Sequence, residues 1–256
     1  MAVDEALLLS FDPAASLPIL RLYSWTPPAL SLGRFQDAAL VLNIDKCRTA
    51  GVPIVRRITG GGVIYHADEL TYSIVCAPRH IPSTPSIKES FRVLTSFLLV
   101  FYKNLGLEPC YAADACHGRR LGERTAFCFA GKETYDILVK GKKIGGNAQR
   151  RLKEVIFQHG SIPLENRAEK GGTFMRESPH DLREQTSSLA ESGIKRDEAD
   201  LKSLLAESFC EGMGVTLQEE EFTQLEQAKS TELRRKYLDE SWNLRGTCPV
   251  TPLSSP

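Results

Sequence analysis

Residues 56–66 read Arg-Arg-Ile-Thr-Gly-Gly-Gly-Val-Ile-Tyr-His, a glycine-rich turn between two apolar segments that are typical of strands. Three successive glycines let the backbone approach a ligand closely, and the side chains of Arg56, Arg57 and Thr59 suit a phosphate or a carboxylate. The stretch is neither a Walker A loop, because no Gly-Lys-Ser/Thr ends it, nor a dinucleotide-binding loop that opens a helix. Taken alone, it is equally consistent with an exposed hairpin turn followed by a structural histidine, His66.

Outward from this turn, the chain has a mixed α and β pattern. Hydrophobic periodicity predicts strands at residues 19–25, 29–33, 52–56, 63–66, 70–77 and 155–164, and a hairpin of residues 134–139 and 143–149. It predicts helices at residues 4–11, 83–104, 196–210 and 217–237, and a connecting loop at residues 165–186. A capping box of Thr216 and Glu219 is expected to begin the last helix.

Composition sets the broad class of the protein. The chain has 256 residues, of which 42% are hydrophobic and 25% charged, as in an ordinary globular enzyme. The 32 basic and 32 acidic residues balance, so no overall field favours nucleic acid or an anionic membrane as a partner. Seven cysteines without a CxxC pair suit reduced thiols. With no secretory signal and no apolar run long enough for a membrane span, a cytoplasmic protein is expected.

Two further segments carry candidate chemistry. Lys143, within residues 141–149, enters a strand beside a glycine-rich turn, where a fixed cation can stabilise developing negative charge; an exposed hairpin with solvated lysines is the alternative. Cys128 is a candidate nucleophile, although composition alone favours a buried structural cysteine between two phenylalanines, the usual environment of a free cysteine. The spacing of Cys110, Cys116 and His117 matches no zinc pattern, so no metal site is expected.

Five motifs in chain order resemble the lipoate-protein ligase A family. They are residues 1–7, 32–36, 56–62 with His66, 143–149, and 158–161, and the resemblance covers about residues 1–165. That family shares a fold with biotin protein ligases, which implies an α+β protein with mixed, largely antiparallel sheets flanked by helices. We therefore expect a single catalytic domain over residues 1–246, with 187–246 as its helical C-terminal part and 247–256 as a disordered tail.

The family contains two chemistries. ATP-dependent ligases form an acyl-adenylate, whereas cysteine-dependent octanoyltransferases take octanoate from acyl carrier protein through a thioester on the enzyme. The surroundings of Cys128 resemble the nucleophile region of the transferases, and the chain is short for a ligase with an accessory domain. The resemblance thus implies octanoyl transfer, in lipoate biosynthesis, to a lysine of a lipoyl domain such as the glycine cleavage H protein, with no cofactor. An ATP-dependent lipoate or octanoate ligase, a carrier-to-carrier octanoyl amidotransferase and an idle acyl-binding partner remain alternatives.

The resemblance also implies roles for individual residues. Cys128 is expected to be the nucleophile and Lys143 to hold the thiolate or the oxyanion. Residues expected to bind substrate are Arg56, Arg57, Thr59, Gly60, Gly61, Gly62, His66, Gly146, Ala148, His159 and Gly160. A basic patch expected to receive acidic carrier proteins comprises Lys140, Lys142, Lys143, Arg150, Arg151 and Lys153. Gly145 and Asn147 depart from the residues that the family often has at these positions.

Overall fold

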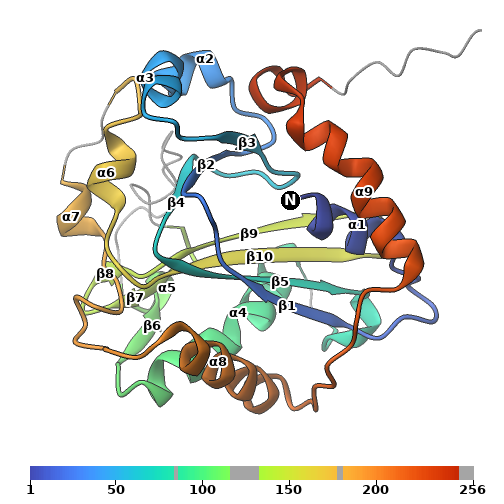
Figure 1. The fold of residues 1–256 in the computed structure, drawn as a ribbon. Helices are drawn as coiled ribbons and strands as arrows, with labels where there is room; N and C mark the ends of the chain where they lie inside the picture. The colour runs from blue at the N-terminus through green and yellow to red at the C-terminus, as the bar shows by residue number, and fades with distance from the viewer. Residues whose placement is uncertain (84–85, 116–132, 178–180, 248–256) are drawn as a thin grey trace, which may run out of the picture.

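The computed structural model describes residues 1–83, 86–115, 133–177 and 181–247. Figure 1 shows the arrangement of the sheets and helices in these ranges. The main sheet has the strand order β1 (Ile19–Tyr23), β5 (Glu69–Cys76), β10 (Ile156–Pro163) and β9 (Gly146–Arg151), and each strand is antiparallel to its neighbour. This mixed architecture of largely antiparallel sheets flanked by helices confirms the predicted fold class.

Two smaller sheets complete the described strands. In one, β2 (Ala29–Leu32) lies between β3 (Ile54–Arg56), which is parallel to it, and β4 (Ile64–His66), which is antiparallel. The connection from β3 to β4 is the glycine-rich turn, which we call the glycine loop (residues 57–63). In the other, β6 (Pro109–Tyr111), β7 (Ile137–Val139) and β8 (Lys142–Lys143) are antiparallel.

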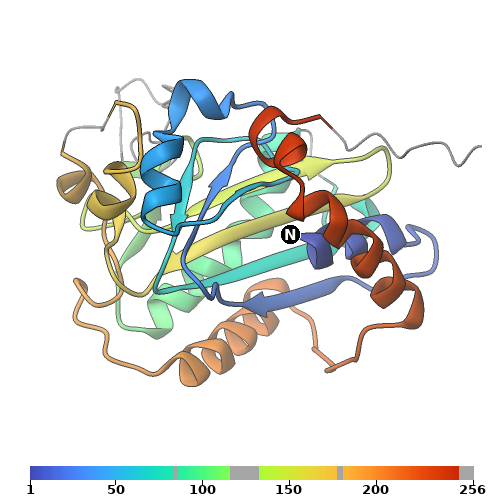
Figure 2. The same ribbon diagram turned by 45° about the horizontal axis from the view of Figure 1, so that its top comes forward.

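Helices cover both faces of the main sheet (Figure 2). On one face, α4 (Ile87–Asn104) packs against α8 (Glu198–Met213) and buries the apolar side chains of β5 at even-numbered positions, such as Tyr72. On the other face lie α1 (Ala2–Ser10) and α9 (Gln224–Leu238), which pack against each other. This second face carries the odd-numbered positions of β5, because successive side chains of a strand point to opposite sides.

Short helices connect these layers. They are α2 (Ala38–Val41), α3 (Ile44–Thr49), the 3₁₀ turn η1 (Pro78–His80), α5 (Ala112–Ala115), α6 (Ala168–Gly172), α7 (Leu182–Gln185) and the π-helical turn η3 (Ser241–Arg245). The predicted loop at residues 165–186 therefore contains two short helices, α6 and α7. Within the described ranges, no helix is long and apolar enough to cross a membrane.

The predicted start of the last helix is wrong. Helix α9 begins at Gln224 rather than near residue 217, and its capping box consists of Thr223 and Glu226 instead of Thr216 and Glu219. Both pairs have the required spacing, but residues 214–225 are all exposed. Because a short helix is marginal without an apolar face to bury, the earlier cap has no helix to stabilise.

The predicted hairpin of residues 134–139 and 143–149 is correct only in its first part. Strands β7 and β8 form a hairpin through Lys140 and Gly141, both at positive φ, but β8 ends at Lys143. The chain then crosses at Gly145, with φ +93°, into the main sheet as β9. A Cβ on Gly145 would lie 2.2 Å from the backbone oxygen of Ser161, so this crossing requires glycine.

We expect Gly145→Ala to destabilise the protein more than Gly193→Ala. Both glycines have similar φ angles, +93° and +85°, but a Cβ on Gly193 would meet nothing within 4 Å. The clash with Ser161 should therefore lower the free energy of unfolding by about 1 to 3 kcal/mol beyond the backbone strain that both variants share. Urea denaturation measures the difference, and equal losses in the two variants would contradict the tight crossing.

Candidate active site

A polar cluster lies on the α1 face of the main sheet. Strand β5 places Glu69, Thr71 and Ser73 there, and β10 adds His159 and Ser161 from the neighbouring strand. All five side chains are buried, and on each strand they alternate with residues that face the α4 side. The sheet thus supports an apolar core on one face and a hydrogen-bonded polar site on the other.

His66 is held on three sides. Its Nδ1 lies 2.6 Å from Oε1 of Glu69, its Nε2 lies 2.7 Å from Oγ of Ser31, and its ring stacks on Trp25 with centroids 4.1 Å apart. When Nδ1–H donates to Glu69, Nε2 can accept from the Ser31 hydroxyl, whose oxygen accepts from Arg57. The tautomer and the orientation of the imidazole are therefore defined together.

Glu69 connects this histidine to the rest of the sheet. Its Oε1 also accepts from the Thr71 hydroxyl at 2.7 Å, and its Oε2 accepts from the Ser161 hydroxyl at 2.5 Å. A buried carboxylate is costly unless it is hydrogen-bonded, and here both oxygens have donors. Glu69 thereby fixes His66 on β4 relative to β10.

Arg57 supports the glycine loop from within. Its Nη1 donates to the backbone oxygen and the hydroxyl of Ser31, both at 3.0 Å, and its Nη2 donates to the backbone oxygens of Gly60 and Gly62 at 2.8 and 2.6 Å. On the outer side of the loop, a Cβ on Gly33 would lie 2.0 Å from the backbone oxygen of Gly61. The loop is thus closely packed from both sides.

Arg56 is equally buried and binds backbone oxygens. Both Arg56 and Arg57 are 1% exposed. The guanidinium of Arg56 donates to five backbone oxygens, those of Gly33, Arg34, Gln36, Trp242 and Leu244. In this arrangement both arginines build the loop rather than present charge at the surface, and the direct substrate contact expected of them stays a prediction.

His159 ties the glycine loop to the main sheet. Its Nε2 lies 2.7 Å from Oγ1 of Thr59. Burial lowers the pKa of His159 to about 3, and the nearby positive charge of Arg57 contributes in the same direction. The imidazole is therefore neutral in the folded protein at physiological pH.

The paired strands β9 and β10 bring together the remaining predicted binding residues. Gly146 lies opposite Ser161, and Ala148 lies opposite His159. A Cβ on Gly160 would lie 2.1 Å from Oδ1 of Asn147, which accepts from the Tyr72 hydroxyl at 2.7 Å. Asn147, which departs from the family pattern, thus uses the space that Gly160 leaves.

Lys143 forms a buried ion pair. Its Nζ lies 2.7 Å from Oδ2 of Asp136, and the two side chains are 3% and 6% exposed. The same carboxylate oxygen accepts from the backbone N–H of Glu133 at 2.7 Å. A cation held in this way is well oriented for electrostatic stabilisation of a neighbouring anion. Its burial also means that Lys143 is not part of an exposed basic patch.

The remainder of that patch is divided between two places. Lys140 and Lys142 lie at the β7–β8 hairpin, whereas Arg150, Arg151 and Lys153 lie at the far end of β9, where the chain turns into β10 (Figure 1). Six residues of β9 span about 20 Å. The expectation of one continuous patch is therefore wrong, because residues 143–149 cross between two sheets.

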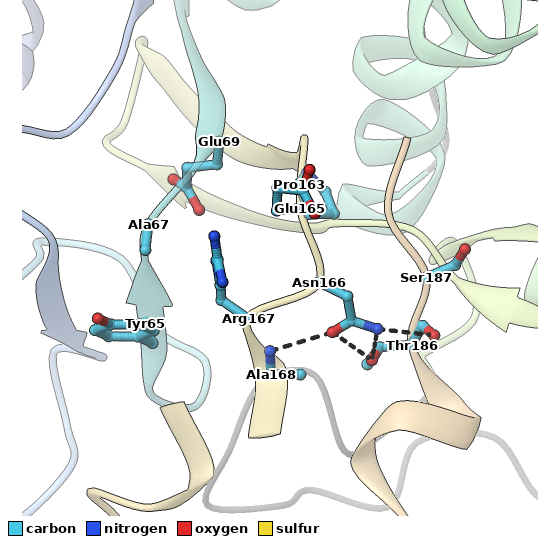
Figure 3. A pocket seen from close by; sticks show the side chains of 10 residues that line it. All are labelled: Tyr65, Ala67, Glu69, Pro163, Glu165, Asn166, Arg167, Ala168, Thr186 and Ser187. Atoms are coloured by element: carbon cyan, nitrogen blue, oxygen red, sulfur yellow. Dashed lines mark hydrogen bonds between the residues drawn. The ribbon is translucent and has the colours of Figure 1, made fainter. Parts of the chain in front are cut away.

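A small cavity lies between Glu69 of the polar cluster and the segment of Thr186 and Ser187, which contacts strand β8. Figure 3 shows Glu69 on one side and Thr186 and Ser187 on the other. Its lining residues are Tyr65, Ala67, Glu69, Pro163, Glu165, Asn166, Arg167, Ala168, Thr186 and Ser187. The backbone N–H of Ser187 donates to the backbone oxygen of Lys143 at 2.9 Å. The cavity thus separates the carboxylate that orients His66 from the strand that carries Lys143.

Sequence reasoning missed Glu69, Ser31 and Trp25. The alternation of polar and apolar residues over Glu69–Cys76 could have identified Glu69, Thr71 and Ser73 as one polar face. The predicted nucleophile Cys128 lies outside the described residues. Within the described ranges, no cluster of three or more His, Cys, Asp or Glu side chains could hold a metal ion.

We expect His159 to make the stability of the protein dependent on pH. The folded protein keeps this imidazole neutral down to about pH 3, whereas in the unfolded chain it binds a proton near pH 6.5. Between these values the unfolded state binds more protons, so stability falls as the pH drops below 6.5, by up to about 1.4 kcal/mol per pH unit. His159→Gln should lose this component of the slope in urea titrations from pH 7.5 to 5. Parallel curves for the two proteins would contradict a buried neutral His159.

Comparison with known proteins identifies relatives of this chain. The profile described as Lipoyl protein ligase A/B catalytic domain matches residues 1–210. The chain is 34% identical to the octanoyltransferase LipM of Kyrpidia tusciae, with 96% of this chain and 93% of that protein covered. It is 32% identical to the octanoyltransferase LipM of Staphylococcus aureus, over 96% of this chain and 93% of the relative.

Solved structures of similar fold are lipoate-protein ligases. A crystal structure of lipoate-protein ligase A bound with ATP has a TM-score of 0.79 and 25% identity, and the match covers 95% of this chain and 92% of the other. A lipoate protein ligase of T. acidophilum with bound lipoic acid gives the same TM-score, identity and coverage.

Proposed function

Because the chain belongs to the lipoyl protein ligase A/B catalytic domain family, we propose that it moves an octanoyl group from acyl carrier protein, through a thioester on Cys128, to a lysine of a lipoyl domain. The observation that carries the proposal is its similarity to octanoyltransferases over 96% of its length. The protein is accordingly an acyltransferase of lipoate biosynthesis. Cys128 and the two carriers are the proposed details.

The proposed reaction consists of two acyl transfers, first to Cys128 and then to the acceptor lysine. In the first, the Cys128 thiolate attacks the carbonyl carbon of the octanoyl thioester; the bond to the carrier's sulfur breaks, and the departing thiolate takes up a proton. In the second, the ε-amine of the acceptor lysine attacks the enzyme thioester, loses a proton, and expels the Cys128 thiolate. The acceptor is a lipoyl domain, such as the glycine cleavage H protein. Neither step requires a nucleotide or a metal.

Lys143 supplies positive charge in this scheme. Each step passes through a tetrahedral species with a negatively charged oxygen, and a preoriented cation stabilises that charge more than it stabilises the ground state. The ion pair with Asp136 and the buried position of β8 fix Lys143 in place without solvent reorganisation. The glycine loop, His66 and the β9–β10 residues form the wall for the acyl group and its carrier arm.

We expect Lys143→Met to slow acylation of Cys128 by about 10²- to 10³-fold, the effect of removing one oxyanion-stabilising donor. Since this variant also leaves Asp136 buried without its ion pair, the double variant Lys143→Met, Asp136→Asn keeps the region uncharged and controls for folding. Lys46→Met, at an exposed position of α3, is the matched surface control. Single-turnover acylation by octanoyl carrier protein, followed by intact mass, measures the rate. A folded Lys143→Met enzyme with wild-type acylation would exclude this role.

Donor selection tests the proposed function itself. An apo lipoyl domain is incubated with the enzyme and either octanoyl carrier protein, octanoate plus ATP and Mg²⁺, or an octanoylated second lipoyl domain. We expect octanoylation only with octanoyl carrier protein, a hydroxylamine-sensitive octanoyl adduct on the wild-type enzyme, and at least a 10³-fold loss of transfer in Cys128→Ala.

The other donors correspond to different functions. Modification with octanoate and ATP would identify a ligase, a possibility favoured by the likeness to lipoate-protein ligase A bound with ATP. Modification from the second lipoyl domain would identify an amidotransferase. Full transfer by Cys128→Ala would exclude the thioester on this residue.

A further inference from the structure

The C-terminal turn η3 covers the free edge of strand β3. This strand is at the edge of its sheet, and its last residue is Arg56. The backbone N–H of Arg56 donates to Oδ1 of Asn243 at 3.0 Å, and its backbone oxygen accepts from Nε1 of Trp242, also at 3.0 Å. Two side chains of η3 therefore form hydrogen bonds with the backbone N–H and C=O of Arg56, the residue that precedes the glycine loop.

The side chain of Arg56 strengthens the same contact. Its Nε donates to the backbone oxygen of Trp242 and its Nη2 to that of Leu244, both at 3.0 Å. Its Nη1 donates to the backbone oxygens of Gly33 and Gln36 at 3.0 and 2.6 Å. One guanidinium thus connects η3 to the segment that packs against the outer side of the glycine loop.

Trp242 and the glycine loop also share a buried apolar cluster. Trp242 is 2% exposed and belongs to the same cluster as Ile58, the second residue of the glycine loop. Nζ of Lys236 lies 3.9 Å from the centroid of the Trp242 ring, and Nδ2 of Asn243 donates to the backbone oxygen of Tyr237 at 2.8 Å. The turn is therefore fixed to α9 as well as to the loop.

Helix α9 is in turn anchored to α1. The buried carboxylate of Glu5 accepts from Nζ of Lys236, at 2.7 and 2.8 Å, and from the hydroxyl of Tyr237 at 2.7 Å. Hence a continuous set of buried contacts runs from α1 through α9 and η3 to the start of the glycine loop. The matched family profile ends at residue 210, before α9 and η3 begin.

We propose that η3 positions the glycine loop for the transfer reaction, with Trp242 and Asn243 as positioning residues. This inference rests on the proposed function, in which the loop contacts the acyl substrate. A glycine-rich loop has many accessible backbone conformations, so contacts that fix its first residues raise the fraction of molecules in the productive one. Apparent efficiency falls in proportion to that fraction when a contact is removed.

Hydrogen exchange and kinetics together test the proposal. Trp242→Phe keeps an aromatic ring but removes the indole N–H that donates to Arg56, and Asn243→Ala removes both the acceptor for the Arg56 N–H and the donor to Tyr237. In both variants we expect faster amide exchange within residues 57–63 and up to about a tenfold fall in kcat/KM for octanoyl carrier protein, the size of one lost hydrogen bond. Asn243→Gln, which keeps both the amide oxygen for Arg56 and an amide N–H for the backbone oxygen of Tyr237, should restore both measurements partway toward wild type.

Leu238→Ala is the matched control, because this residue of α9 is 72% exposed. It should leave exchange in residues 57–63 and kcat/KM unchanged. Circular dichroism and the urea midpoint report the folded fraction of every variant. The proposal is overturned if exchange in residues 57–63 does not respond to Trp242→Phe or Asn243→Ala, or if kcat/KM falls only as the folded fraction does. Because exchange requires no turnover, a wild-type enzyme that fails to transfer octanoate would contradict the proposed function without obscuring this result.

Discussion

The site depends on two adjacent buried guanidinium groups. Arg56 ends strand β3 and Arg57 begins the glycine loop, so their side chains leave the backbone in opposite directions. Arg57 points beneath the loop and binds the backbone oxygens of Gly60 and Gly62, whereas Arg56 points to the C-terminal turn η3. Removing either guanidinium would leave several buried carbonyl groups without donors, each at a cost of about 1 to 3 kcal/mol.

Burial of two cations is tolerated here because backbone dipoles replace water. Burial lowers the pKa of Arg56, against a smaller opposing effect from the carboxylate of Asp37, but an arginine stays charged in a protein. Lys143 is compensated differently, by the carboxylate of Asp136, and the carboxylate of Glu69 is hydrogen-bonded to His66. In each case the buried charge is held in a fixed orientation by its partners.

The sequence predicts the strands around the glycine loop, because strand alternation and glycine turns are local properties. It does not predict that Arg56 and Arg57 are buried. An arginine is ordinarily exposed, and the burial of these two depends on carbonyl groups from residues 31–36 and 242–244. Likewise, residues 143–149 look like one strand until the contact between Gly145 and Ser161 divides them between two sheets. Glu69 could have been recognised by alternation alone. The nucleophile Cys128 stays a prediction from its sequence context.

The C-terminal segment beyond the family profile takes part in the structure of the site. The profile matches residues 1–210, although the similarity to octanoyltransferases covers 96% of the chain. The hydrogen bonds of β3 extend beyond residue 210: its edge N–H and C=O groups are paired by Asn243 and Trp242, more than 180 residues along the chain. An unpaired edge strand next to a glycine-rich loop would be open both to water and to alternative pairing. The C-terminal turn is therefore part of the structure that holds the glycine loop, and variation in α9 and η3 among related enzymes is expected to act on the loop through Arg56.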